Sequence, residues 1–425
     1  MGFPIWMDYR TMSLPIQNLY QSLRRNGVVR FMEHFQTMFP DSHMKDLVVD
    51  EAGPGREIVI GGRRVINFGS DSFLGLDRDP RVQEAIVHGI EKWGTHNGTS
   101  RAFSSVRANV EAEEKIAAWL GMDAALIYPS VTLANAGAIP GLVTKSDIVV
   151  ADEYAHNSIH EGNKVAKANG SRVLSFRHND VDHLAETLKN ARPYRNALIT
   201  IDGVYSMSGQ LPPLKEMHAV ALENDAILYV DDAHGTGVLG NHGRGSVYDN
   251  LGSYENTFVI GSLSKAFSCL GGFVGCPKEF HQLLKIRSNS YIFGGPVAPC
   301  YLEAVCAVVD ILMSDEYEAI KNRLQTNLER LVDGAERLGL HVLGGRTPII
   351  SILVGDEEAT LRSGKFLFER GFYVQSVTFP AVPYHAGVIR IQVNANHEPS
   401  QIDRLVGALS ELCNAMPLLD VKQAA

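Results

Sequence analysis

The segment AILYVDDAHGTGVLG, residues 226–240, joins an apolar run to two acids, a histidine and several glycines. An uninterrupted apolar run such as AILYV is typical of a strand that is buried on both faces of a sheet. The polar part is open to two interpretations. Gly235, Gly237 and Gly240 spell the G-x-G-x-x-G of a dinucleotide-binding loop, whereas Asp231 and His234 could instead be the working groups of a site, with the glycines as a turn.

Similar apolar runs lie on both sides of this segment, and helical patterns separate them. Helices are expected over residues 133–143, 156–169, 181–191 and 214–225. Strands are expected at 124–130, 147–153, 172–176, 196–203, 226–234, 256–265 and 272–276. This alternation of nearly continuous apolar strands with helices predicts an α/β fold with a mostly parallel sheet.

The pattern changes towards both ends of the chain. Residues 14–38 read as an amphipathic helix interrupted near Gly27, so residues 1–56 are expected to form an arm that packs on its own protein or a second subunit, or lies on a membrane surface. A hairpin around Gly61–Gly62 and a helix over 80–94 open a large domain, 57–296. The remaining residues, 297–425, predict a smaller α+β domain, with helices over 298–338, 358–370 and 399–415 and strands at 340–345, 348–354, 372–377 and 388–393.

The composition of the 425-residue chain excludes several classes of protein. The net charge of −9 gives no support for non-specific binding to nucleic acid, which needs a basic face. The five cysteines show no C-x-x-C spacing, as expected in a reducing compartment. No apolar stretch reaches the ~18–20 residues of a membrane helix, and the first residues lack the pattern of an export signal. We therefore expect a cytoplasmic protein without a membrane span.

The spacing disfavours a dinucleotide-binding loop at 235–240. In that fingerprint the glycines follow the strand directly and a helix opens at the third glycine. Here residues 231–234 stand between the strand and Gly235, and the sequence NHGRGSVYDN after Gly240 is too glycine-rich for the start of a helix. Turn formation explains the glycines better.

A second pair of residues suggests a metal site. His156 and His160 lie four residues apart on one face of a predicted helix, as the zinc ligands of H-E-x-x-H do. The glutamate of that motif is missing and no third ligand is evident. A metal site is therefore the weaker interpretation, and we expect none.

Asp231, His234 and Lys265 follow neighbouring predicted strands. The carboxyl ends of parallel strands line the crevice in which such folds bind ligands, so these three side chains are expected to converge. Lys265 on its own could be a surface lysine in a salt bridge. Together with a carboxylate it fits pyridoxal 5'-phosphate, which needs a lysine for its Schiff base and an acid at its pyridine nitrogen. The lysine has to be desolvated or near positive charge to react at neutral pH.

The chain resembles the α-oxoamine synthase family of pyridoxal-phosphate enzymes over about residues 57–415. This family has the aspartate aminotransferase-like fold type I, and its members include serine palmitoyltransferase, 8-amino-7-oxononanoate synthase, 2-amino-3-ketobutyrate CoA ligase and 5-aminolevulinate synthase. The resemblance is carried by five motifs: VDDAH (230–234), GSLSKAF (261–267), DEYAHNSIHEG (152–162), IDGVYSMSGQLPPLKEM (201–217) and GVIRIQVNANH (387–397).

The resemblance implies a role for each matching residue. At the cofactor ring, it implies Lys265 as the Schiff-base lysine, Asp231 at the pyridinium nitrogen, His234 towards the 3-oxygen or the substrate carbonyl, and His156 on the ring face. The other implied contacts are Ser206 near the ring oxygen, Ser262 and Ser264 at the phosphate, and Arg390 as a fork on the carboxylate of the amino acid.

The sequence departs from the family pattern around the phosphate and the substrate. Val131 and Thr132 replace a glycine–aromatic pair at the phosphate, although the Thr132 hydroxyl could still bond it. Gly294 and Gly295 replace the hydroxyl pair that reaches across the dimer, and their backbone N–H groups could still serve an anion. The remaining changes are Thr378 for a second arginine of serine palmitoyltransferase, Ser72 for an asparagine and Val110 for a histidine. These changes indicate altered specificity rather than lost activity.

By resemblance, the chain is a homodimeric enzyme with its active sites at the subunit interface. It is expected to condense an amino acid with an acyl thioester, on CoA or a carrier protein, to an α-amino ketone with loss of carbon dioxide. GVYSM, FRHND and YIF favour a serine palmitoyltransferase-like enzyme, whereas TFPAVP favours the ketobutyrate ligase. A different fold-type-I lyase or aminotransferase, a nucleotide-binding protein and a non-catalytic synthase subunit are rival interpretations, and Lys265 argues against the last of these.

Overall fold

The computed structural model describes residues 14–39, 47–96, 98–345 and 347–416. Its centre is a seven-stranded sheet in the order β4-β10-β9-β8-β7-β5-β6. Strand β10 runs antiparallel to its neighbours β4 and β9, and the pairs among β5, β6, β7, β8 and β9 are parallel. The strands are β4 (Ala124–Tyr128), β5 (Ile148–Asp152), β6 (Arg172–Phe176), β7 (Ala197–Asp202), β8 (Ala226–Asp231), β9 (Thr257–Ser262) and β10 (Gly272–Cys276). The predicted mostly parallel α/β sheet is confirmed.

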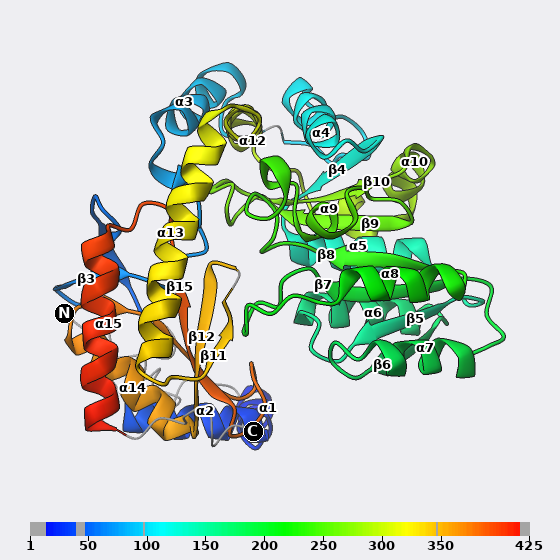
Figure 1. Ribbon diagram of the computed structural model, residues 1–425. Coiled ribbons are helices and arrows are strands. Elements are labelled where there is room, and N and C mark those ends of the chain that lie inside the picture. The colour runs from blue at the N-terminus through cyan, green and yellow to red at the C-terminus, as the bar shows by residue number, and fades with distance from the viewer. Residues whose placement is uncertain (1–13, 40–46, 97, 346, 417–425) are drawn as a thin grey trace.

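Helices cover both faces of this sheet (Figure 1). Consecutive residues of one strand lie in different apolar clusters: Ile127 and Ile199 belong to one, Leu126 and Leu198 to the other. Burial on both faces explains why the strands are apolar without alternation. The helices are α4 (Arg107–Leu120), α5 (Val131–Leu142), α6 (Asn157–Ala168), α7 (Val181–Asn190), α8 (Leu214–Glu223), α9 (Ser246–Leu251), α10 (Lys278–Arg287) and α11 (Asn289–Phe293), with a short 3₁₀ turn, η3 (Asn241–Gly243).

Four of these helices differ from expectation. Helix α9 begins at Ser246, inside the stretch that was expected to be too rich in glycine for a helix start, because the glycines end at Gly245 and the Asp232 carboxylate accepts a hydrogen bond from the Ser246 N–H at 2.6 Å. The helical patterns of α4, α10 and α11 were missed in the sequence.

The C-terminal part forms a second α+β unit, on the left of Figure 1. Its sheet has the order β11-β12-β15-β14 and is antiparallel throughout. The helical stretch expected over 298–338 is two helices that separate at Ser314. The elements are α12 (Pro299–Met313), α13 (Glu316–Arg337), β11 (Val342–Gly344), β12 (Ile349–Gly355), α14 (Glu357–Glu369), β14 (Gln375–Val377), β15 (Gly387–Gln392) and α15 (Pro399–Ala415).

A third, four-stranded sheet joins the two ends of the chain. Its order is β1-β2-β3-β13, formed by β1 (Val49–Ala52), β2 (Glu57–Ile60), β3 (Arg63–Asn67) and β13 (Phe372–Tyr373). The hairpin of β2 and β3 was expected, but β1, inside the predicted helical arm, was not. Strand β3 pairs in parallel with β13. The hairpin grouped by sequence with the large domain is therefore bonded to the C-terminal part, while the proposed domain boundaries remain a prediction.

Helix α3 (Pro80–Trp93), which follows a short 3₁₀ turn, η2 (Leu76–Arg78), also connects the two parts of the chain. It packs closely on α12, because Gly89 faces Cys300 so tightly that an added Cβ would lie 2.5 Å from the Cys300 Cα. Only a residue without a side chain allows the two backbones to approach this far. Two helices from the first and last thirds of the chain therefore pack directly on each other.

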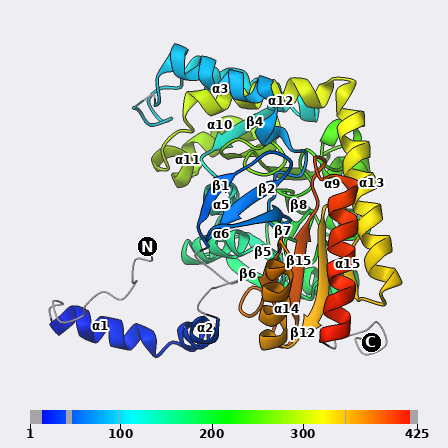
Figure 2. The same ribbon diagram turned by 90° about the vertical axis from the view of Figure 1, so that its left-hand side faces the viewer.

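The N-terminal arm consists of α1 (Leu14–Arg24) and α2 (Gly27–Met38), separated at Asn26, which caps α2. Figure 2 shows α1 farthest from the body of the molecule, and none of its residues is buried. Helix α2 packs on its own chain: Phe35 and Phe39 cluster with Leu361, and the ring of Phe31 lies 5.6 Å from that of Phe379. No helix within the described ranges is long and apolar enough to cross a membrane.

Candidate active site

The ends of three neighbouring strands form the site. Strands β7 and β8 pair in register, so their last residues, Asp202 and Asp231, lie side by side. Lys265 follows three residues after the end of β9, at Ser262. The Lys265 Nζ lies 2.6 Å from Nε2 and 3.1 Å from Nδ1 of His234. A cavity of about 180 Å³ lies over these strand ends, lined by Ser130, Val131, Thr132, His156, Asp202, Asp231, Ala233, His234, Ser262, Ser264 and Lys265.

A buried hydrogen-bond network holds Asp231 in place. Its Oδ2 accepts a hydrogen bond from Asn135 Nδ2 at 2.7 Å. Asn135 is fully buried and also donates to Ser158 Oγ at 2.8 Å, while its Oδ1 accepts from the Tyr229 hydroxyl at 2.8 Å. The Ser158 Oγ in turn lies 2.7 Å from His156 Nδ1. Asn135 thus ties the acid at one end of the cavity to the histidine above it, a role that no sequence motif indicated.

The other end of the cavity is suited to an anion. Val131 and Thr132 open α5, and Ser130 caps it by accepting a hydrogen bond from the Leu133 N–H at 3.2 Å. The exposed backbone N–H groups and the dipole of a helix N-terminus attract phosphate. The hydroxyls of Ser262 and Ser264, 3.1 Å apart, line the same cavity. A phosphate group fits here even without the aromatic residue of the family pattern.

Burial controls the charges in the cavity. It lowers the pKa of Lys265, with the carboxylates of Asp71 and Asp231 opposing this effect. Burial and the nearby Lys265 lower the pKa of His234 well below its usual range. Burial also lowers the pKa of His156. The pKa of Asp202 is raised well above its usual range by burial and by the charge of Asp231. The site therefore favours an uncharged amine and uncharged imidazoles beside Asp231.

Arg390 and Ser206 do not line this cavity, but the charge of Arg390 is near enough to lower the pKa of both Lys265 and His234. Arg390 is buried in β15, and its Nε donates to the Ser206 backbone oxygen at 2.7 Å. Its Nη1 donates to Gln375 Oε1 at 2.6 Å, and its Nη2 to Asp71 Oδ1 at 3.2 Å. Three acceptors therefore fix the plane of the guanidinium, which is a condition for bidentate recognition of a carboxylate.

The other expected residues lie outside the 180 Å³ cavity. Ser72 donates from Oγ to Asp77 Oδ1 at 3.1 Å and accepts from Arg56 Nη2, so its hydroxyl is used within the protein. Thr378 follows β14, where its Oγ1 lies 3.4 Å from the Phe379 oxygen. Gly294 and Gly295 follow α11 and do not line the cavity of their own chain.

A larger cavity, of about 660 Å³, opens beside the first. It shares His156 with the smaller one and also reaches Ser206. Its walls come from the large α/β unit and from the C-terminal α+β unit. They include His178, Tyr205, Leu353, Phe379 and Val388. An apolar cavity that meets a cluster of polar reacting groups is the usual form of a substrate site.

The two other sequence features have structural explanations. Gly237 packs so closely on the residue after Lys265 that an added Cβ would lie 2.9 Å from the Ala266 Cβ. This close contact explains why a glycine stands at position 237. His160 lines the larger cavity. Within the described residues, the side chains near enough to share an ion are those of Asp356, Glu357 and His385, and neither His156 nor His160 is among them.

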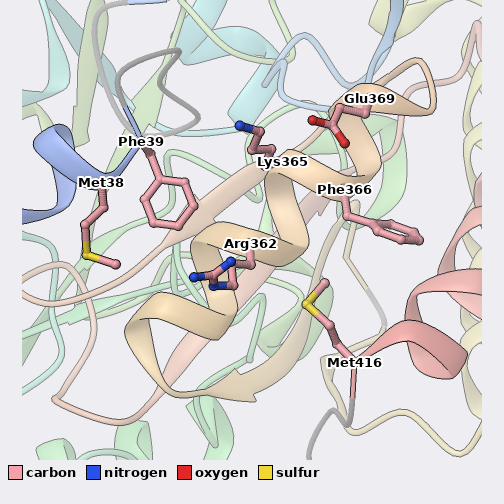
Figure 3. Close-up of a pocket in the computed structure, with 7 residues that line it drawn as sticks. All are labelled: Met38, Phe39, Arg362, Lys365, Phe366, Glu369 and Met416. Atoms are coloured by element: carbon pink, nitrogen blue, oxygen red, sulfur yellow. The ribbon is translucent and has the colours of Figure 1, made fainter.

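A further pocket, of about 330 Å³, lies elsewhere on the surface (Figure 3). Met38 and Phe39, at the end of α2, lie on one side of α14, and Phe366 and Met416 on the other. The guanidinium of Arg362 lies 6.0 Å from the Phe39 ring. None of the elements that form this pocket contributes to the Lys265 cavity.

Comparison with known proteins gives consistent matches over most of the chain. The aminotransferase class I and II family matches residues 63–409. The 8-amino-7-oxononanoate synthase of Geobacter sulfurreducens is 35% identical over 359 residues, 84% of this chain and 91% of that protein. The same enzyme of Alkaliphilus oremlandii is 33% identical over 391 residues, 91% of this chain and 97% of that protein.

Solved structures agree with these matches. Serine palmitoyltransferase from S. paucimobilis has a TM-score of 0.85 and 27% identity, covering 92% of this chain and 99% of that chain. The Sphingomonas wittichii enzyme has a TM-score of 0.85 and 26% identity, covering 91% and 97%. The serine palmitoyltransferase from S. paucimobilis binds pyridoxal phosphate. The cavity fits this cofactor, since a buried acid, a buried amine and a helix N-terminus surround one space. The chain therefore belongs to the α-oxoamine synthase family, pyridoxal-phosphate enzymes of fold type I within aminotransferase class I and II.

Proposed function

We propose that this enzyme condenses a small amino acid with a long-chain acyl thioester, as a serine palmitoyltransferase-like synthase. The products are an α-amino ketone, carbon dioxide and the free thiol of CoA or of a carrier protein. The observation that carries the proposal is that Asp231, His234 and Lys265 line one 180 Å³ cavity, which shares His156 with a 660 Å³ cavity. Arg390 donates to the backbone oxygen of Ser206, a residue that lines the larger cavity. Bound pyridoxal phosphate would supply an electron sink for the pair left on the α-carbon when its proton is removed.

Lys265 is the base in this proposal. Its Nζ would hold the cofactor in the resting enzyme and take the α-proton of the amino acid once released. Burial lowers the pKa of this amine, so the proton-accepting form is available closer to neutral pH than for an exposed lysine. The Lys265 Nζ and His234 Nε2 lie 2.6 Å apart, so the two groups can share a hydrogen bond while the amine is free.

Asp231, His156 and His234 would orient the reacting groups. Asp231 would keep a proton on the ring nitrogen of the cofactor, and Asn135 fixes its carboxylate for this task. The neutral imidazole of His156 would pack on the ring. His234, held uncharged by burial, would donate an N–H to the oxygen that becomes negative when the thioester carbonyl is attacked.

The two substrates would occupy separate parts of the site. Arg390 would bind the carboxylate of the amino acid, since the guanidinium is buried and held in one plane by three acceptors. The acyl chain would lie in the larger cavity, whose apolar wall includes Leu353, Phe379 and Val388. The size of this cavity favours a long acyl chain over a short one such as acetyl.

We further propose that the enzyme works as a cytoplasmic homodimer. All five cysteines are free thiols, as expected in a reducing compartment. Gly294 and Gly295 lie outside the cavity of their own chain, and their backbone N–H groups would reach the phosphate of a second subunit.

The test is an assay of the enzyme loaded with pyridoxal phosphate, using a set of amino acids and acyl-CoA thioesters. Release of free thiol together with an α-amino ketone in the mass spectrum is expected, with Lys265→Ala losing at least 10²-fold in rate. Borohydride should attach the cofactor to the peptide that contains Lys265. Turnover of an amino acid without consumption of thioester would instead identify a lyase or aminotransferase and overturn the proposal.

A further inference from the structure

The substrate arginine has an acidic neighbour that no motif predicted. Asp71 lies in the segment after β3, and its Oδ1 accepts hydrogen bonds from Arg390 Nη2, at 3.2 Å, and from Gln392 Nε2. Both partners belong to β15, which also bonds to this segment through the Gln392 N–H and the Phe68 oxygen at 2.8 Å. The backbone therefore sets the position of Asp71 relative to Arg390.

Asp71 leaves room for a substrate carboxylate on Arg390. A guanidinium has five N–H donors, and three are used here by Ser206, Gln375 and Asp71. One N–H remains on each terminal nitrogen, which suffices for a bidentate pair with a carboxylate. Asp71 can thus stay in place while the amino acid binds beside it.

Asp71 also lies within electrostatic reach of the reacting amine. Among the groups that oppose the effect of burial on the pKa of Lys265, the Asp71 carboxylate is the strongest, ahead of Asp231. The Asp71 side chain is 33% exposed, whereas that of Arg390 is 4% exposed. Its carboxylate is therefore an accessible negative charge near both groups that handle the amino acid.

Within the described part of the chain, the second oxygen of this carboxylate has no donor. The hydrogen bonds that reach the Asp71 side chain from those residues all end on Oδ1. A substrate side chain with a hydroxyl can donate a hydrogen bond to such a carboxylate oxygen, whereas an alkyl side chain leaves the oxygen without a donor. An acidic side chain would be repelled.

We propose that Asp71 determines specificity by accepting a hydrogen bond from the side chain of the substrate, and so selects small amino acids with a side-chain hydroxyl. The proposal rests on the amino-acid site of the proposed function. It predicts that serine binds better than alanine, which differs only by the hydroxyl group. A site built for such a donor rejects the analogue that lacks it, because its own acceptor stays unpaired.

The experiment is a titration of the enzyme loaded with pyridoxal phosphate, without thioester, followed by the change in cofactor absorption. The measured quantity is the ratio of the Kd for alanine to the Kd for serine. A ratio of about tenfold or more is expected for the wild type. It should fall towards one in Asp71→Ala and to an intermediate value in Asp71→Asn, which keeps an acceptor oxygen. Asp79→Asn, which removes a carboxylate at the start of α3, should leave the ratio unchanged.

The ratio of the two Kd values distinguishes a role of Asp71 in selecting the substrate side chain from a role in orienting Arg390. If Asp71 only oriented the arginine, both Kd values would rise together and the ratio would stay at its wild-type value, which would overturn the proposal, as would a wild-type ratio near one. Asp71→Asn serves if Asp71→Ala fails to fold. If serine binds better than alanine but no acyl-CoA releases its thiol, the proposed condensation would be wrong and the role of Asp71 would still be supported.

Discussion

Asn135 connects the cofactor acid to two other elements through one side chain. It donates to Asp231 and to Ser158, and accepts from Tyr229. A buried polar group that loses its partner costs about 1–3 kcal/mol. We therefore expect Asn135→Ala to leave Asp231 less firmly placed and to raise the Kd for pyridoxal phosphate by roughly tenfold, measured by quenching of protein fluorescence on addition of the cofactor.

Asn250→Ala is the matched control for this variant. Asn250 also uses its amide within the protein, donating to the Ser246 oxygen at 2.9 Å, but it lies in α9 and does not line the cavity. The affinity of the Asn250→Ala variant for pyridoxal phosphate should equal that of the wild type. Equal affinities for both variants would show that the network around Asp231 is not needed to hold the ring.

Asp232 adds a pH-dependent term to stability next to the site. Burial raises its pKa from 3.8 to about 7, while its Oδ2 accepts the Ser246 N–H. For an acid whose folded pKa lies above the unfolded value, the stabilising contribution is complete below pH 3.8 and is lost as the pH rises through 7. A shift of about three units corresponds to about 4 kcal/mol at most.

Asp232→Asn should therefore be more stable relative to the wild type at pH 8 than at pH 5, because the amide cannot ionise. Thermal unfolding at both pH values measures this difference. Glu186→Gln, a change at an exposed acid of α7 that does not act on Asp232, should show no such pH dependence. An identical shift in Tm at pH 5 and pH 8 for Asp232→Asn would contradict the assignment.

At the scale of elements, the contact between α5 and α6 depends on Gly162. An added Cβ there would lie 2.5 Å from the backbone oxygen of Asn135 and 3.0 Å from Ile139 Cδ1. Gly162→Ala should push α6 away from α5 and lower the free energy of unfolding by about 1–3 kcal/mol. Since His156 caps α6, cofactor affinity should fall as well; urea unfolding and cofactor titration measure the two effects.

Gly407→Ala provides the opposite case for comparison. Gly407 lies inside α15 with no heavy atom within 4 Å of an added Cβ. Alanine there should stabilise the protein by about 0.5–1 kcal/mol, because it favours the helix over the unfolded chain. If Gly162→Ala stabilises the protein as Gly407→Ala does, the α5–α6 contact is not as tight as described.

The sequence was informative for elements with strong local patterns. Six of the seven strands of the central sheet stand in buried apolar runs, whereas β6 is partly exposed. Alternation with helices predicted the parallel pairs among β5 to β9, but not that β10 runs antiparallel to its neighbours. Strand β1 and the pairing of β3 with β13 could not be predicted, because a pair between residues about 300 positions apart leaves no local pattern. Local motifs predicted that Lys265, Asp231 and His234 belong to one site. The roles of Asn135 and Asp71 could not be predicted, because they depend on contacts with residues that are distant in the sequence.

At the scale of the whole molecule, the arm borders the wall of the larger cavity. The Phe31 ring of α2 lies 5.6 Å from that of Phe379 and 5.7 Å from that of Tyr384, and Phe379 lines that cavity. Phe31→Ala would remove two aromatic contacts, each worth about 0.5–1.5 kcal/mol. We expect KM for the acyl thioester to rise roughly fivefold to tenfold, with KM for the amino acid unchanged.

Leu19→Ala is the control, because Leu19 lies on α1 and its side chain is exposed. Steady-state kinetics with each substrate varied in turn distinguishes the two variants. A rise in both KM values of Phe31→Ala would mean that the arm supports the whole site rather than its acyl part.

The third sheet bears on how the enzyme is made. Phe372 pairs with Ile66, and Arg390 meets Asp71, although 306 and 319 residues separate the partners. A ribosome delivers the chain from its N-terminus, and domains generally fold as they emerge. A nascent chain that has passed residue 300 already contains the lysine and its acid, but the hairpin still lacks its neighbour and the arginine has yet to be translated. The part of the enzyme that chooses its amino acid is therefore completed last.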